Sequence, residues 1–217
     1  MVEYQRICWY LQVDPEIDAE ATQVADKLMR GRLPAIEDLE KTIEGKDVVV
    51  FGAGPSLEHQ IVNLEKDERV LICADGTVSA LLKKDIVPDV NATDLDGNID
   101  DILRANRLGT ITVIHAHGHN IEKLKEFVPR FKGKIVMTTQ NAPTRNVKNF
   151  FGFTDGDRAV ALARYFRARE IELLGFDFGD VVGKYSDPAT PENHAADEWK
   201  KKKLEIAEYL VEKFLKK

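Results

Sequence analysis

Aspartates recur in this sequence at the points where apolar, β-branched runs end. They are Asp75, Asp94 with Asp96, Asp155 with Asp157, and Asp177. In an extended segment, the two-residue spacing of Asp94 and Asp96 puts both carboxylates on one side. Neighbouring carboxylates repel each other, and a divalent cation such as Mg²⁺ relieves the repulsion while also binding substrate phosphates. We therefore predict a magnesium site at Asp94 and Asp96, with two ordinary turn residues as the alternative.

A glycine-containing loop, Gly52-Ala-Gly-Pro-Ser-Leu57, follows the apolar run 47–51. Glycine lets backbone N–H groups approach a phosphate closely, and the start of a following helix adds partial positive charge. Ser56 can cap that helix or donate to a phosphate oxygen. Leu57 occupies the third glycine position of the dinucleotide fingerprint, and no Gly-Lys-Ser/Thr of a Walker loop follows. We predict a phosphate-binding loop; the alternative is a tight turn without a ligand.

Three histidines, His115, His117 and His119, alternate after another apolar run. An extended segment would place the three rings on one face, a geometry that zinc sites use. The segment also contains Gly118 and Asn120, so the histidines could instead line a polar substrate pocket or have a purely structural role. These alternatives stay open at the level of the sequence.

Strand-like and helix-like segments alternate from residue 46 onward. Strands are expected at 47–51, 69–74, 87–92, 110–114, 134–138 and 171–174, and helices at 57–64, 78–84, 121–131, 157–167 and 199–217. This alternation predicts an α/β fold with a mostly parallel, open, Rossmann-like sheet and helices on both faces. The predicted polar residues then meet at the carboxyl ends of the strands, where such sheets bind ligands.

The two ends of the chain are predicted to be helical. Residues 1–45 form an N-terminal helical segment, which starts a helix at Asp14-Pro15 and is broken at Gly31 and Pro34, and residues 46–217 form the catalytic domain. The C-terminal helix carries an apolar stripe, with Lys200 to Lys203 near its start. The stripe must pack either on the domain itself or against a second subunit.

Composition limits the partners of the protein. The 217 residues include 31 Lys and Arg against 37 Asp and Glu, a net charge of −6, which gives no general attraction for nucleic acid or for an anionic membrane. No apolar run approaches the ~20 residues that span a bilayer, and no leader is recognised, so a cytoplasmic location is expected. Cys8 and Cys73 lie among apolar residues and are expected to be buried, reduced thiols.

The ordered motifs resemble those of thiamin pyrophosphokinases. The shared segments are Ala74-Asp75-Gly76, Val87-Pro88-Asp89, Thr93-Asp94-Leu95-Asp96-Gly97 and Thr154-Asp155-Gly156-Asp157. The chain departs from that family at Gly97, where the family has serine. Little sequence follows Phe178 to build the second, all-β domain of that family.

A fuller resemblance is to the archaeal 6-hydroxymethyl-7,8-dihydropterin pyrophosphokinases of the MptE type, over about residues 48–180. It adds Gly52-Ala-Gly-Pro-Ser-Leu57, His115-Ala-His-Gly-His-Asn120, Gly152-Phe-Thr-Asp-Gly-Asp-Arg158 and Gly175-Phe-Asp177. His119 stands where an acidic residue is more usual in that family. The resemblance implies that ATP gives its two terminal phosphates as a unit to the hydroxymethyl group of a reduced pterin, and that AMP leaves.

The resemblance also implies roles for individual residues. Mg²⁺ would be held by Asp94 and Asp96, with Asp75 joining directly or through water, and Asp157 would complete the catalytic set of Asp75, Asp94, Asp96 and Asp157. The nucleotide would lie against Gly52, Gly54, Pro55, Ser56 and Arg158, and the pterin against His115, His117, Asn120 and Asp155. Either Asp155 or Asp157 could bind the amino-pyrimidinone edge or assist the attacking hydroxyl as a base. Arg158 could clamp a phosphate or be an ordinary surface arginine.

Two other functions fit parts of the pattern. The loop from Gly52 to Leu57 also resembles that of sialyltransferases, which are nucleotide-sugar-dependent glycosyltransferases, but the Thr93-Asp94-Leu95-Asp96 segment argues against them. A non-catalytic nucleotide-binding module would not require so many strand-end carboxylates. Without a second domain to cover the substrate, a neighbouring subunit could supply that cover, so a homodimer is expected.

Overall fold

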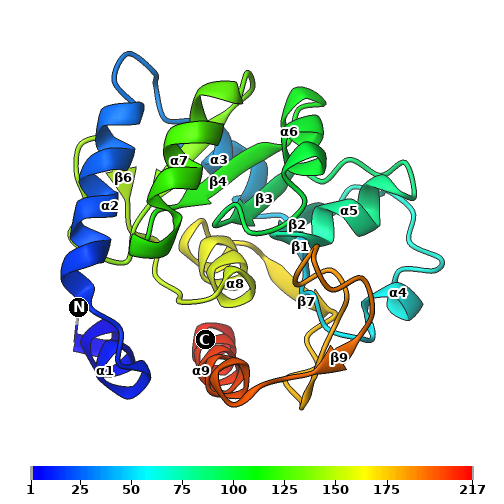
Figure 1. The fold of residues 1–217 in the computed structure, drawn as a ribbon. Helices are drawn as coiled ribbons and strands as arrows, with labels where there is room; N and C mark the ends of the chain where they lie inside the picture. Colours follow the sequence, from blue (N-terminus) through cyan, green and yellow to red (C-terminus); the bar gives the residue numbers. More distant parts are fainter. Residues whose placement is uncertain (1, 217) are drawn as a thin grey trace.

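The computed structural model describes residues 2–216, which form a seven-stranded parallel sheet with helices on both faces (Figure 1). The strand order is β6-β5-β4-β3-β2-β1-β7. The strands are β1 (Asp47–Phe51), β2 (Val70–Ala74), β3 (Val90–Thr93), β4 (Ile111–His115), β5 (Ile135–Thr138), β6 (Val147–Lys148) and β7 (Glu170–Leu174). The predicted α/β, Rossmann-like architecture is confirmed.

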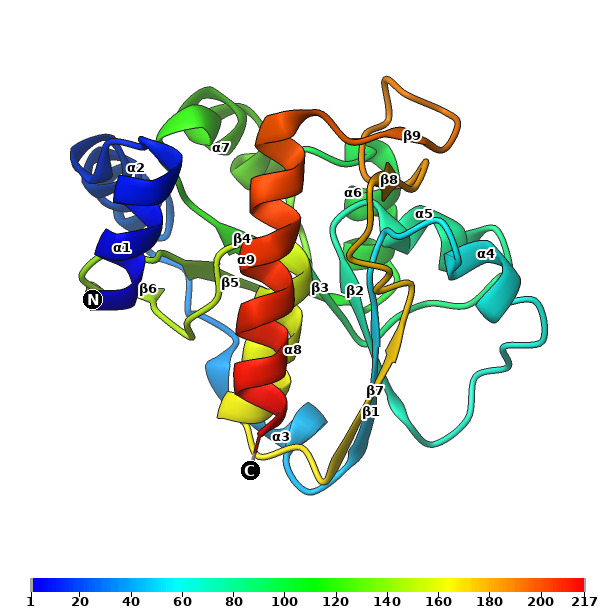
Figure 2. The same ribbon diagram turned by 90° about the horizontal axis from the view of Figure 1, so that it is seen from below.

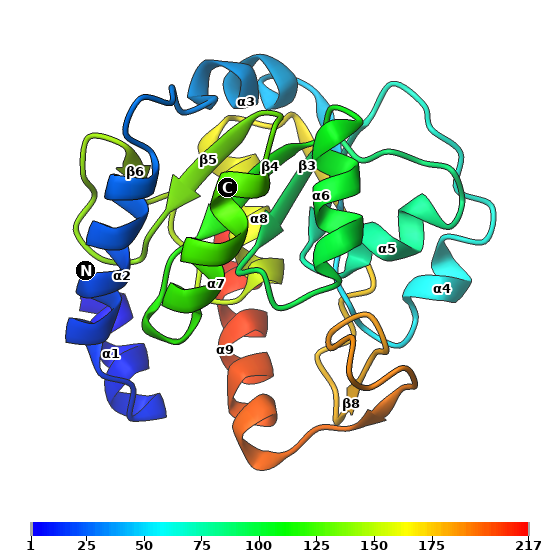
Figure 3. The same cartoon turned by 45° about the horizontal axis from the view of Figure 1, so that its top comes forward.

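Two apolar layers hold the sheet, one on each face. In β1, Val49 and Phe51 face the layer that contains α2 (Pro15–Leu28), α5 (Thr77–Leu82), α6 (Ile99–Arg107) and α7 (Ile121–Phe127). Val48 and Val50 face the opposite layer, with α3 (Ile36–Ile43), α8 (Asp155–Tyr165) and α9 (Glu198–Leu215). Figure 3 shows α5, α6 and α7 in front of the strands and α8 and α9 behind them. Because both faces are covered, β1 can be an unbroken apolar run without alternation.

The structure differs from the sequence-based expectations in several short elements and in the nine-residue helix α6, which was not among the expected helices. Helix α4 (Leu57–Gln60) ends four residues before the expected Leu64, and the expected helix 121–131 divides into α7 and a 3₁₀ turn, Val128–Arg130. Pro129 lies in that turn, where it cannot donate the backbone hydrogen bond that would continue the helix. Strand β6 was not expected, and neither were β8 (Val181–Val182) and β9 (His194–Ala195), which pair with each other in a separate small sheet. Strands of two residues leave little pattern in a sequence.

The N-terminal segment contains α1 (Val2–Leu11), α2 and α3. The expected start of α2 and the break before α3 are confirmed, and the Asp14 side chain accepts a hydrogen bond from Glu16 N at 2.8 Å. Helix α2 lies beside α7 at one edge of the sheet (Figures 1 and 3). The domain boundary at 45/46 stays a prediction.

The apolar stripe of α9 is buried within the chain. Ile206, Ala207, Leu210 and Val211 are buried, and α9 runs along α8 with α1 nearby (Figure 2). The stripe therefore packs on the domain itself and does not need a second subunit to cover it.

Two further expectations concern the thiols and membranes. Cys8 and Cys73 are both buried free cysteines, as expected. Burial raises the pKa of Cys73 to about 12, which keeps it protonated. Among residues 2–216, no helix combines the length and the apolar character needed to cross a bilayer.

Candidate active site

A cavity of about 570 Å³ opens at the carboxyl edge of the sheet. Strands β1 and β7 are neighbours there, but β1 leads to helices on one face, while β7 is reached from α8 on the other. Loops that leave adjacent strands toward opposite faces create the crevice in which α/β sheets bind ligands. The expected location of the site is therefore reproduced by the fold.

Three carboxylates converge in this cavity: Asp75 after β2, Asp94 after β3 and Asp155 at the start of α8. Each offers an oxygen, and these oxygens all lie within 4.8 Å of one another. We call these three residues the carboxylate trio. Oxygen donors alone, brought together from two strand ends and the start of a helix, fit Mg²⁺ well, because this hard cation completes its shell with water and phosphate oxygens.

Burial and mutual repulsion set the protonation of the trio. They raise the pKa of Asp75 to about 7, against a stabilising hydrogen bond from Thr93 Oγ1 at 2.6 Å. Burial and the charges of Asp94 and Asp75 raise the pKa of Asp155 well above its usual value. For Asp94, burial opposes ionisation, but the contact with His117 and the charge of Lys203 outweigh it and lower the pKa. The trio thus consists of one anion and two carboxyl groups that resist ionisation. A cation bound among them would offset their mutual repulsion and favour the ionised form of all three.

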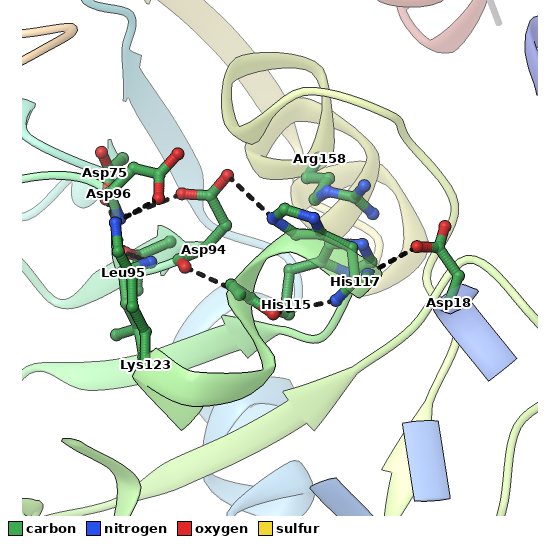
Figure 4. A network of polar contacts seen from close by, with 12 residues as sticks. Asp18, Asp75, Asp94, Leu95, Asp96, His115, His117, Lys123 and Arg158 are labelled. Carbon is green, nitrogen blue, oxygen red and sulfur yellow. Dashed lines mark hydrogen bonds and ion pairs between the residues drawn. The ribbon is translucent and has the colours of Figure 1, made fainter. Parts of the chain in front are cut away.

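Asp96 does not join the trio. Its carboxylate pairs with Lys123 at 2.6 Å (Figure 4), and the residue is exposed. Leu95 between the two aspartates has a φ of +69°, so the segment is not extended and the expected alternation fails. Asp155 occupies the place that the sequence analysis gave to Asp96. The sequence gives no sign that Asp155 rather than Asp96 joins the trio, because leucine rarely adopts a positive φ and the turn at Leu95 could not be expected.

The three histidines all line the cavity. The rings of His115 and His117 stack with centroids 5.9 Å apart, and His117 Nε2 lies 3.4 Å from Asp94 Oδ2 (Figure 4). Burial, with Arg158 close by, lowers the pKa of His115 well below its usual value, which favours a neutral ring. Among residues 2–216, the carboxylate trio is the group of three His, Cys, Asp or Glu side chains whose possible ligand atoms converge. The three histidines do not form such a group. The structure thus favours a polar pocket wall over a histidine zinc site.

Asn120 supports the site rather than lining it. Its Nδ2 donates to the carbonyls of Asp94 at 2.8 Å and His115 at 2.7 Å, and its Oδ1 accepts from His117 N at 3.1 Å. With all three groups satisfied and 1% of the residue exposed, Asn120 ties the histidine segment to the loop that carries Asp94. The sequence analysis placed it against the pterin.

Arg158 is buried and its guanidinium lines the cavity, so it is not the surface arginine of the alternative interpretation. Nη2 donates to Gln140 Oε1 at 2.8 Å and to Phe153 O at 2.6 Å. Gln140 in turn donates to Asp18 Oδ2 at 2.9 Å, and Asp18 also accepts from Gly118 N at 2.7 Å. Asp18 and Gln140 escaped the sequence analysis, although an aspartate within the apolar stripe of α2 was a signal.

Asp157 is fully buried, and its carboxylate fastens the turn that begins α8. It accepts from Phe153 N, from Thr154 N at 2.8 Å and from Thr154 Oγ1 at 2.7 Å. These bonds form a capping box with Thr154. Its carboxylate therefore positions Asp155 and Arg158. Asp157 also lines the cavity, and the catalytic role that the sequence analysis gave it stays a prediction.

The glycine loop is covered by the segment after β7. Gly52 and Gly54 line the cavity, whereas Pro55 and Ser56 do not. Asp177 Oδ2 accepts from Ser56 N at 3.0 Å and from Ser56 Oγ at 2.9 Å. The donors that we expected to face phosphate are thus bonded to a carboxylate in this structure.

Close backbone contacts explain the glycines of this loop. A Cβ on Gly52 would lie 2.6 Å from Gly175 O, and one on Gly183 would lie 2.3 Å from Ala53 O. Residues 176–186, which we call the strap, therefore pack directly on the loop. Further cavity walls come from Phe176 and Val182 of the strap and from Lys200 and Lys203 of α9.

Comparison with known proteins identifies the family of this chain. A family model described as 6-hydroxymethylpterin diphosphokinase MptE-like matches residues 22–183. A protein of Pyrococcus furiosus is 43% identical over 96% of this chain and 90% of its own length, one of Methanothermobacter thermautotrophicus is 40% identical over 94% and 91%, and one of Methanocaldococcus jannaschii is 39% identical over 96% and 91%. All three are named 6-hydroxymethyl-7,8-dihydropterin pyrophosphokinase. With three quarters of its length inside the family model and three such relatives, the chain belongs to the MptE-like 6-hydroxymethylpterin diphosphokinase family.

Proposed function

We propose that the protein transfers diphosphate from ATP to 6-hydroxymethyl-7,8-dihydropterin in a Mg²⁺-dependent reaction of pterin cofactor biosynthesis. The single observation that carries the proposal is the convergence of Asp75, Asp94 and Asp155 beside the glycine loop, in a chain whose relatives bear that name. The donor ATP and the metal are parts of the proposal and rest on the chemistry of the site.

The reaction joins the hydroxymethyl oxygen to the β-phosphorus of ATP. The bond from that phosphorus to the oxygen shared with the α-phosphate breaks, the hydroxyl proton is lost, and AMP departs. Mg²⁺, held by the carboxylate trio, would neutralise negative charge on the transferred diphosphate. Arg158, fixed through Gln140 at 2.8 Å, adds a positioned cation in the same cavity.

The cavity also offers surfaces that suit a flat, reduced pterin. Phe176 and Trp199 supply apolar walls beside the polar groups of His117 and Asp155. An aromatic wall with a few directed polar groups is typical of small-molecule sites. We propose that the pterin ring lies against these walls, with its hydroxymethyl group toward the carboxylate trio.

Product analysis tests the proposed function. The purified protein is incubated with ATP, Mg²⁺ and the pterin, and the nucleotide products are separated by chromatography. AMP should appear only when the pterin and the metal are both present. Release of ADP, or turnover with thiamin but not with the pterin, would refute the proposal, and transfer of sugar from a nucleotide sugar would support the glycosyltransferase instead.

We also propose a homodimer, on the basis of exposed aromatic side chains on α1 and α9. Trp9 is 83% exposed and Tyr209 is 57% exposed, and they lie on helices that pack side by side. The strap and α9 already cover the cavity, so the dimer would not be needed to close the site.

A further inference from the structure

The first turns of α9 carry four consecutive lysines whose side chains have different surroundings. Lys200 and Lys203 line the cavity, three residues apart and therefore on the same face of the helix. Lys201 instead pairs with Glu198 at 3.4 Å and Asp180 at 3.5 Å. The Lys202 ammonium lies 5.6 Å from the centroid of the Tyr10 ring. Only half of the cluster is thus directed at the site.

The two inward lysines are not there to stabilise the fold. Lys200 lies in the first turn of α9, where a cation opposes the helix dipole, and burial together with the charge of Lys203 lowers the pKa of Lys200. Lys200 Nζ donates to Ser186 Oγ at 2.9 Å, and among residues 2–216 neither ammonium forms a direct ion pair with a carboxylate. Holding two half-buried cations side by side is costly unless an anion binds between them.

The same cavity contains the carboxylate trio, whose charges reach both lysines. The charge of Lys203 acts on Asp94 and Asp155, and the charges of Asp155 and Asp94 act on Lys200. Cations that face carboxylates across a cavity without touching them leave room for a ligand that binds to both. A diphosphate fits, because its oxygens can bind a metal on one side and accept hydrogen bonds from ammonium groups on the other.

We propose that Lys200 and Lys203 bind the diphosphate that is transferred, and that α9 is therefore part of the active site. The inference deepens the proposed function and rests on it. Helix α9 lies outside the residues that the family model matches, 22–183, so these two lysines are not assigned by the comparison. As point charges on flexible stems, they can follow the diphosphate from ATP to the pterin hydroxyl.

Calorimetric binding of magnesium pyrophosphate tests this role. The K200M/K203M variant keeps the aliphatic bulk but removes both charges, and we expect at least about a tenfold loss of affinity, which corresponds to ~1.4 kcal/mol. The matched control is K201M/K202M, on the same helix but directed away from the cavity, which should change the affinity by less than about twofold. K200R/K203R, which retains the charges, should recover most of the lost affinity.

A second measurement separates this role from a structural one. Without phosphate, Mn²⁺ binding to the carboxylate trio should be unchanged or tighter in K200M/K203M, because two nearby positive charges are gone. Loss of both Mn²⁺ and pyrophosphate binding would mean that the lysines only hold the fold, and would overturn the inference. Wild-type pyrophosphate affinity in K200M/K203M, or no pyrophosphate binding by the wild type, would overturn it as well. The proposed function is judged separately, by whether the wild type forms AMP from ATP and the pterin.

Discussion

At the scale of single residues, substitutions of Asp155 and Asp96 test whether the carboxylate trio binds the metal. Asp94→Asn and Asp155→Asn should each lower turnover by on the order of 10²-fold or more, because a metal-bound diphosphate loses an anionic ligand. Asp96→Asn should lower it by less than about tenfold, since its carboxylate pairs with Lys123 outside the trio. The measurements are steady-state AMP formation and Mn²⁺ affinity. An inactive Asp96→Asn beside an active Asp155→Asn would restore the ligand pair that the sequence suggested.

The raised pKa of Asp75 predicts that the free energy of unfolding of the metal-free protein depends on pH. Its folded-state pKa of about 7 lies above the usual 3.8, so the folded state holds this proton more tightly than the unfolded state. The resulting stabilisation is fully present below about pH 4 and is lost as the pH rises through 7. The loss is on the order of a few kcal/mol, since one pKa unit corresponds to ~1.4 kcal/mol.

Urea unfolding in the presence of a chelator, at pH 5 and pH 8, measures this effect. The wild type should lose more stability than Asp75→Asn over that interval, because asparagine has no proton to lose. Equal losses in the two proteins would contradict the assignment. Added Mg²⁺ should stabilise the wild type more at pH 8 than at pH 5, because the cation competes with the proton.

The residue scale also shows the limits of the sequence. Spacing and residue type identified Asp75 and Asp94, because a carboxylate directly after a buried strand has to lie at the sheet edge. Neither could show that Leu95 adopts a φ of +69°, that Asp96 lines the cavity outside the carboxylate trio, or that the Asp157 carboxylate accepts from three donors of its own turn. These outcomes depend on local hydrogen bonds, and those bonds are set by residues that become neighbours only in the folded chain.

The strap, residues 176–186, gives a prediction at the scale of elements. The Asp177 carboxylate accepts from Ser56 N and Oγ, the donors that the sequence analysis assigned to a phosphate. Asp177→Asn removes a competing negative charge, so Mg·ATP should bind several-fold more tightly, while the free energy of unfolding falls by about 1 kcal/mol. Asp180→Asn, on the same strap but paired with Lys201 at 3.5 Å, serves as the control. Weaker Mg·ATP binding in Asp177→Asn would instead assign Asp177 to holding the nucleotide-bound form.

Predictability differs between the long and the short elements. The buried strands were recognised because a parallel strand covered on both faces is a continuous apolar run, as in Val48, Val49 and Val50. The strap left no such signal, since its one strand, β8, has two residues and its packing depends on glycines such as Gly183 against Ala53. The lysine cluster near the start of α9 was visible in the sequence, but which of its members face the cavity follows only from how α9 lies on α8.

At the scale of the whole molecule, the association state follows from what covers the apolar surfaces. The stripe of α9 is buried in the chain, so the proposed dimer rests on exposed Trp9 and Tyr209. Multi-angle light scattering at micromolar concentration should give twice the chain mass of 24.5 kDa, and Trp9→Ser should shift the protein toward the monomer. A wild-type mass near 24.5 kDa would exclude the dimer under those conditions and leave the site complete in one subunit.

Phosphorus NMR of the complete reaction tests the central claim most directly, because it follows the bond that breaks. With ATP, Mg²⁺ and 6-hydroxymethyl-7,8-dihydropterin, we predict that the three ATP signals are replaced by the single phosphate of AMP and by two coupled phosphates of a pterin diphosphate ester. The signals should not change when the metal is chelated or the pterin is left out. Signals of ADP with a pterin monophosphate, or no pterin-dependent change, would contradict the account.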